Sequence, residues 1–166
     1  MGARGFNVAE EGHVVSILSP QSISGGVTST PFHMKYAAKA NIIIQYGALA
    51  GAPGAITVKA CSDASGDGAT AIPFTYYTKS AAGNTADTLD LVTGPSAANS
   101  ATAEGFTPAD NINTFVEIVI QSDQLPAGLP YIEVTLASGA VANYASAVAI
   151  LTGLSYAGSQ QPTVTT

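Results

Sequence analysis

One short stretch of this sequence has the residue types and spacing of a ligand site. In ACSDASGDGATAIPF, residues 60–74, Asp63, Ser65, Asp67 and Gly68 occupy positions 1, 3, 5 and 6 of a twelve-residue calcium loop. The last position of such a loop requires a glutamate that donates two oxygens, and Phe74 stands there instead. We therefore expect a tight hairpin, in which Asp side chains cap backbone amides and glycines at 66 and 68 adopt positive φ. The alternative is a weak cation site of a type other than an EF-hand.

Other reactive side chains are few. The histidines are His13 and His33, and Cys61 is the single cysteine. The sequence contains neither a G-x-S-x-G nor an H-E-x-x-H motif, and neither histidine has a partner at zinc-ligand spacing. We expect His33 on one face of a strand, His13 in a peripheral segment and Cys61 as a small buried apolar residue. The sequence therefore predicts no catalytic residue, no metal and no cofactor, which favours a protein that is not an enzyme.

Composition favours an all-β fold. The 166 residues include 17 Gly and 9 Pro at short intervals, which leaves little room for long helices. Five Lys and Arg face 11 Asp and Glu, a net charge of −6, and the cations are too scattered to neutralise a nucleic-acid backbone. The N-terminal residues lack the apolar segment of a secretory signal, and no window reaches the length of a membrane span. We expect no nucleic-acid partner and no membrane partner.

The elements that would hold these side chains are short strands separated by turns. Alternating or β-branched runs predict about eight or nine strands, the number typical of a single β-sandwich or jelly-roll-like domain. Ile42, Ile43 and Ile44 form a run that is typical of a strand buried on both faces. Pro73 places its strand at an edge or a bulge. The expected strands are residues 13–18, 32–37, 40–47, 55–61, 71–79, 88–92, 115–121, 131–138 and 144–156.

The chain is expected to have three parts. Residues 1–30 are predicted to form an N-terminal arm or a peripheral strand outside the core, because prolines and glycines interrupt them. Residues 31–157 form the predicted sandwich, and residues 158–166 a flexible polar tail.

The strand segments resemble a known group of proteins. The order MKYAAKANIIIQYG, ITVKACSDASGDGATAIPFTYYTK, FVEIVIQSDQLPAGLPYIEVTLAS and AVAILTGLSY is similar to that of small head proteins of tailed bacteriophages. The resemblance covers about residues 32–157. It implies a capsid decoration, or cement, protein that is made in the host cytoplasm and binds the outside of the phage head in the virion.

Such a protein stabilises contacts between subunits of the major capsid protein, because it binds the assembled shell. The resemblance also implies a homo-oligomer, with a trimer favoured over a dimer by analogy, and an arm that contacts the capsid. The arm residues expected at that contact are apolar: Phe6, Val8, Val14, Val15, Ile17 and Leu18.

An alternative function is a carbohydrate- or receptor-binding β-module of a phage tail or fibre. Seven tyrosines could supply surfaces on which sugar rings stack, although tryptophan, common in sugar sites, is absent. They are Tyr36, Tyr46, Tyr76, Tyr77, Tyr131, Tyr144 and Tyr156.

Overall fold

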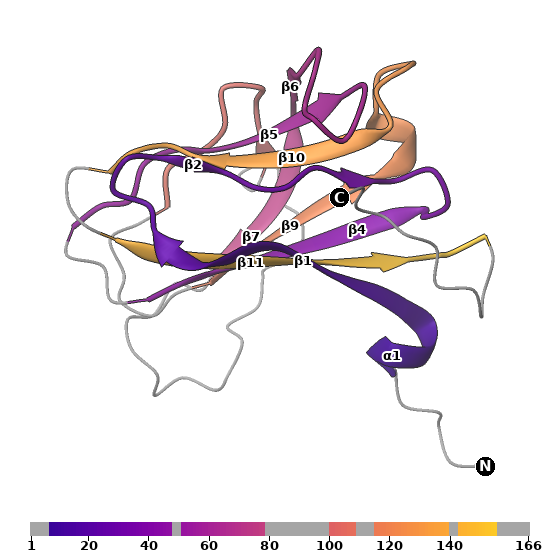
Figure 1. Cartoon of the computed structure of the whole chain (residues 1–166), viewed down its shortest axis with the longest axis horizontal. Coiled ribbons are helices and arrows are strands. Elements are labelled where there is room, and N and C mark those ends of the chain that lie inside the picture. The colour runs from indigo at the N-terminus through magenta and orange to yellow at the C-terminus, as the bar shows by residue number, and fades with distance from the viewer. Residues whose placement is uncertain (1–6, 48–50, 79–99, 109–114, 140–142, 156–166) are drawn as a thin grey trace.

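The protein folds as two antiparallel β-sheets packed face to face as a β-sandwich, which confirms the predicted all-β class (Figure 1). This computed structural model describes residues 7–47, 51–78, 100–108, 115–139 and 143–155. The predicted strand at 88–92, the tail at 158–166 and Phe6 lie outside these ranges. The described residues form eleven strands, more than the eight or nine predicted.

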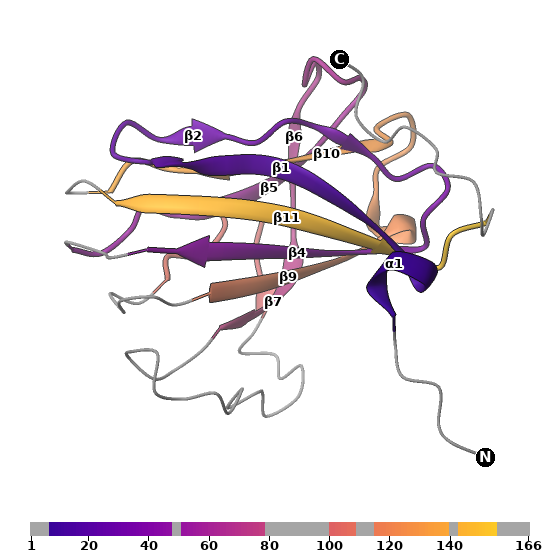
Figure 2. The same cartoon turned by 60° about the horizontal axis from the view of Figure 1, so that its bottom comes forward.

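One sheet has six strands in the order β1-β11-β4-β9-β7-β8 (Figure 2). These strands are β1 (Gly12–Ser22), β11 (Tyr144–Thr152), β4 (Lys39–Tyr46), β9 (Phe115–Gln121), β7 (Phe74–Thr78) and β8 (Ser100–Ala101). All neighbours in this sheet are antiparallel. We call it the six-stranded sheet.

The second, five-stranded sheet has the order β2-β10-β5-β6, and β3 also pairs with β10. Its strands are β2 (Val27–Thr28), β10 (Tyr131–Leu136), β5 (Ile56–Cys61), β6 (Thr70–Ile72) and β3 (Phe32–His33). The remaining elements of the described residues are the four-residue helix α1 (Val8–Glu11) and the 3₁₀ turn η2 (Ser122–Gln124).

The core is formed by the apolar positions of strands that alternate between the two faces of a sheet. In β4, Ile42 and Ile44 are fully buried and Ile43 is partly exposed. The expectation that this strand is buried on both faces is therefore wrong, because the six-stranded sheet has no second layer of described residues over its outer side. The predicted alternation in β9 is confirmed, with Val116, Ile118 and Ile120 buried.

A bent strand joins the two sheets. The segment predicted as one strand at 71–79 is divided at Pro73 into β6, which pairs with β5, and β7, which pairs with β9. Proline has no amide hydrogen to donate to a ladder, so the position where pairing changes from one sheet to the other suits it. The predicted irregularity at Pro73 is thus the corner of the sandwich.

The N-terminal region contributes to the body of the fold. β1 is the edge strand of the six-stranded sheet and pairs with β11 from Gly12 to Ser22. The expectation that this region lies outside the core is wrong, since Val15, Ile17 and Ile23 are buried. A peripheral strand was the other prediction for residues 1–30, and β1 corresponds to it. The sandwich begins at β1, earlier than the predicted boundary at residue 31.

Candidate functional site

The Asp63 loop, residues 62–69, is the hairpin between β5 and β6. The Asp63 Oδ1 atom accepts hydrogen bonds from the backbone amides of Ser65 (2.9 Å) and Asp67 (3.2 Å). Gly66 and Gly68 have φ of +82° and +65°. These are the aspartate cap and the positive φ angles that the sequence predicts, so the hairpin interpretation is confirmed.

The geometry of the Asp63 loop differs from that of an EF-hand. Its flanks are strands where an EF-hand has helices, and Phe74, at the twelfth position, is buried in the core. Oδ1 of Asp63 already accepts two amide hydrogens. In the described ranges, no group of three or more His, Cys, Asp or Glu side chains is arranged to hold a metal ion.

His33 and Cys61 both flank Tyr131 in the five-stranded sheet, each paired with it from a neighbouring strand. The Nδ1 atom of His33 accepts a hydrogen bond from the Lys35 amide (2.9 Å), and its ring meets the Tyr131 ring edge-on with centroids 4.5 Å apart. Burial, and secondarily the charge of Lys35, lower the pKa of His33, which favours the neutral ring that this hydrogen bond requires.

Cys61 is fully buried at the end of β5, as predicted. Burial is the main cause that raises the pKa of its thiol to about 11, and the carboxylates of Glu133 and Asp63 add to the shift. A thiol with a raised pKa is mostly protonated near neutral pH, and the protonated form is a poor nucleophile. The geometry therefore gives Cys61 a packing role.

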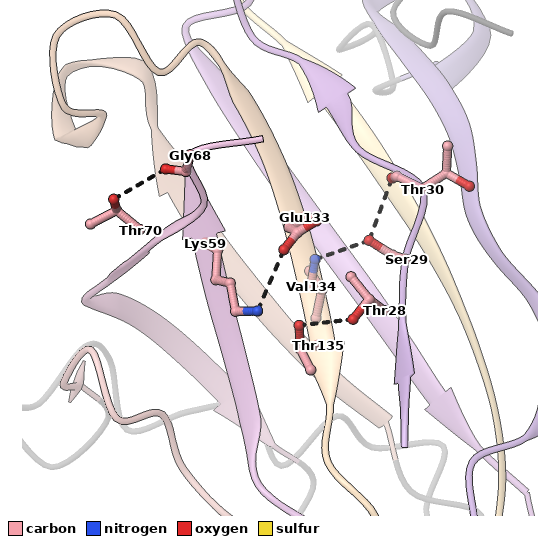
Figure 3. Close-up of polar contacts among 9 residues, drawn as sticks. All are labelled: Thr28, Ser29, Thr30, Lys59, Gly68, Thr70, Glu133, Val134 and Thr135. Atoms are coloured by element: carbon pink, nitrogen blue, oxygen red, sulfur yellow. Dashed lines mark hydrogen bonds and ion pairs between the residues drawn. The ribbon is translucent and has the colours of Figure 1, made fainter. Parts of the chain in front are cut away.

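An ion pair between a partly exposed lysine and a buried glutamate lies next to the Asp63 loop, on the outer side of the five-stranded sheet (Figure 3). The Lys59 Nζ and Glu133 Oε1 atoms are 3.5 Å apart, and Glu133 is only 7% exposed. Gly66 lies directly over this carboxylate, since a Cβ on Gly66 would be 2.8 Å from Glu133 Oε2. The alternation of residues 131–138 placed Glu133 opposite Ile132 and Val134, but its burial depends on a loop distant in sequence.

Ser29 fills the gap between β2 and β3 along β10. Its backbone amide donates to the Val134 carbonyl (2.8 Å), while its Oγ accepts from the Val134 amide (2.9 Å; Figure 3). Thr28 and Thr135 add a hydroxyl–hydroxyl hydrogen bond of 3.2 Å across the same edge. These contacts give hydrogen-bond partners to the backbone groups of β10 between β2 and β3, and so stabilise the fold.

Five of the six residues predicted to contact a capsid are described, and the fold separates them. Val15, Ile17 and Leu18 belong to the chain's own core, so a partner cannot reach them while the sandwich is intact. Val14 is 51% exposed on β1, and Val8 is partly exposed in α1.

The tyrosines are likewise divided between the core and the surface. Tyr46 is buried, and burial raises the pKa of its hydroxyl, whereas Tyr144 is 59% exposed. Tyr76 stacks on Phe106 with ring centroids 3.7 Å apart. Tyr131 lies beside His33, as described above. The Lys35 ammonium lies over the Tyr36 ring, 5.2 Å from its centroid. Tyr156 lies outside the described residues.

Comparison of the chain with protein-family models, with curated proteins and with solved structures finds no match. In the described part of the chain, no helix has the length and apolar character needed to cross a membrane. The fold and the contacts above are thus the basis for a functional proposal.

Proposed function

We propose that this protein is a non-enzymatic structural protein of a phage virion, a homo-oligomeric decoration protein that binds the outside of the head. The observation that supports the proposal is where the segments that carry the sequence resemblance lie in the fold. They supply β4, β5 to β7, β9 to β10 and β11, which are the central strands of both sheets and the corner between them. The resemblance thus covers the folded body of the protein.

A contact role also agrees with the structural hydrogen bonds and the ion pair that the ionisable side chains form. Asp63 caps its own loop, Glu133 pairs with Lys59, and His33 accepts a backbone amide. Each of these groups is thereby committed to stabilising the fold. A rigid β-sandwich with such a surface suits binding to an assembled shell, which stabilises that shell by mass action over many sites.

The proposal can be tested with heads that lack this protein. Purified protein is added to expanded heads, bound protein is measured by cosedimentation, and head disruption is followed on heating. We expect saturable binding and a higher disruption temperature, because at a free concentration of 100 times Kd each site gains about 2.7 kcal/mol. Failure to bind, or binding without any rise in the disruption temperature, would contradict the decoration role.

Val8 in α1 provides a variant for the proposed arm contact. Val8→Lys is expected to weaken head binding while leaving the melting temperature of the free protein unchanged, because Val8 is partly exposed and lies outside both sheets. Thr70→Lys, at an exposed position of β6, is the matched control and should bind as the wild type does. Equal binding by both variants would remove Val8 from the contact.

The second candidate function is a carbohydrate- or receptor-binding module, favoured by the aromatic cluster of His33, Tyr36 and Tyr131. These three side chains are partly exposed at one end of the five-stranded sheet, and Lys35 adds a charge beside them. Partly exposed rings beside a cation can stack on a sugar. A glycan array with wild type and Tyr36→Ala tests this function, and binding that the substitution does not change would exclude the cluster as the site.

A further inference from the structure

The outer face of the six-stranded sheet carries a group of apolar side chains among polar ones. By the alternation of β1, β4, β9 and β11, the side chains on this face come from residues that are exposed or partly exposed between buried ones. Among the outward positions of these four strands, Lys39 and Glu117 carry the only charges. The apolar members are Val14, Ile43, Phe115, Val119, Val148 and Ile150. The uncharged polar members are Ser16, Asn41, Gln45, Gln121, Ser146 and Thr152, and Tyr144 lies at one end.

Strand register places these side chains in rows across the sheet. One row runs Val14, Ile150, Asn41, Val119, and the next runs Ser16, Val148, Ile43, Glu117. Neighbours in a row are one strand apart, about 4.8 Å, so the apolar groups of these two rows form one patch around Asn41. An apolar surface of this extent is typical of an interaction site.

Asn41 lies in the middle of this surface, between Ile150 and Val119. Its Oδ1 atom is shielded from solvent and has no hydrogen-bond partner among the described residues. Buried polar atoms are normally paired, so this amide is open to a partner outside the described residues. Rotation about χ2 can bring Oδ1 or Nδ2 to the surface. An identical amide would then both donate to it and accept from it.

The two charges on the face are also separated within one chain. Lys39 pairs in register with Gln121, whereas Glu117 pairs with Ile43, four residues farther along β4. The separation is about 13 Å along the strand and about 5 Å across it, beyond the reach of an ion pair. Asn41 lies halfway between Lys39 and Ile43 along β4.

From these positions we infer that a second copy of this chain packs on the outer face of the six-stranded sheet, around a two-fold axis that crosses the strands at Asn41. The rotation places Lys39 of each copy over Ile43 of the other, one strand from that copy's Glu117. Sheets that pack face to face are about 10 Å apart, a gap that Lys and Glu side chains can bridge together. The axis also brings the two Asn41 amides together.

The symmetry and the size of the face agree with a dimer. A face that contacts its own copy forms an isologous pair with two-fold symmetry, so this geometry favours a dimer rather than the trimer implied by the resemblance. Four strands by seven residues give a plane of roughly 450 Å² per copy, so the total is near the lower limit for specific interfaces. We therefore expect a reversible dimer. The inference concerns self-association and does not require the capsid role.

The first test measures oligomeric state by sedimentation equilibrium over a concentration series in the micromolar range. Wild type is expected to dimerise, and Ile43→Lys is expected to raise the dissociation constant about 30-fold or more, because a charge replaces an apolar group at the centre of the contact. Thr57→Lys, a partly exposed position on the opposite sheet, is the matched control and should dimerise as wild type does. Thermal melting shows that each variant folds.

A charge exchange tests the arrangement itself. Lys39→Glu and Glu117→Lys should each weaken the dimer about 10-fold, since each places like charges opposite one another, and the double variant should recover wild-type affinity. A monomeric wild type would overturn the inference, whether the face then binds another protein or another segment of this chain. Dimers that Ile43→Lys leaves intact, or a double variant as weak as the single ones, would overturn it as well.

Discussion

Gly105 allows residues 102–106 to pack against β5, and its replacement by alanine should lower the unfolding free energy far more than the same change at Gly128. The two glycines have the same φ of +84°. Nothing lies within 4 Å of a Cβ placed on Gly128, whereas a Cβ on Gly105 would overlap the carbonyl oxygen of Ile56 and lie 2.8 Å from Thr57 Cγ2. The pair therefore separates backbone strain, which is common to both, from the close approach of residues 102–106 to β5.

The expected magnitude follows from the contacts that Gly105 makes possible. A residue with a side chain at this φ costs about 1 kcal/mol at either site. At Gly105 the shift also breaks two hydrogen bonds, from the Phe106 amide to the Ile56 carbonyl (3.1 Å) and from the Ile56 amide to the Phe106 carbonyl (2.8 Å), at about 1 kcal/mol each. Loss of the stacking of the Phe106 ring on the Tyr76 ring adds about 0.5–1.5 kcal/mol. Gly105→Ala should therefore lower the unfolding free energy by about 3–5 kcal/mol, and Gly128→Ala by about 1 kcal/mol.

Urea unfolding followed by far-ultraviolet circular dichroism measures both values. The slope with denaturant should be the same in the wild type and both variants, so that the midpoints report stability alone. If the two variants differ by less than about 1 kcal/mol, the contact between residues 102–106 and β5 does not close the sandwich, and the reasoning is refuted.

Three further predictions concern single side chains. Asp63→Ala should cost about 1–2 kcal/mol by urea unfolding, because two amides lose their acceptor. Added calcium should leave the wild-type melting temperature unchanged, and a rise with calcium would indicate a weak cation site in the loop. Burial raises the pKa of the Cys61 thiol from 9.0 to about 11, so above pH 9 the folded state keeps a proton that the unfolded state loses. The unfolding free energy should therefore fall between pH 9 and 11, and it should fall less in Cys61→Ala. Equal pH profiles of the two proteins would count against this assignment. Ile42→Ala should cost about 2–5 kcal/mol and its neighbour Ile43→Ala under about 1 kcal/mol in the monomer, with equal losses indicating burial on both faces of β4.

Much of the fold could be predicted because strand alternation is local. The period of two in residues 115–121 and 131–136 marked the buried positions, and Asp63 with Gly66 and Gly68 identified the hairpin from turn chemistry alone. Burial of β4 was predicted on both faces because an isoleucine run has the same composition whether one or both sides are covered.

The parts that could not be predicted depend on contacts between distant segments. The N-terminal region was predicted to be peripheral because prolines and glycines between residues 19 and 31 are local signals, whereas the burial of β1 comes from pairing with β11, more than 120 residues away. Glu133 is covered by Gly66, which lies in a different hairpin of the sequence. The backbone of Phe106 forms hydrogen bonds with that of Ile56, which also lies far away in sequence. The apolar outer face is visible only when the registers of four strands are known, so Lys39, Asn41 and Glu117 carried no signal along the chain.

The pairing of β1 with β11 has a consequence for how the protein is made. β11 lies between β1 and β4, so neither strand has its partner on that side until residues 144–152 leave the ribosome. The six-stranded sheet therefore closes late in synthesis, and pairing across so long a loop is slow. Until then the unpaired backbone edges of β1 and β4 are open to other nascent chains, so the yield of folded protein should depend on chaperones and on the rate of translation.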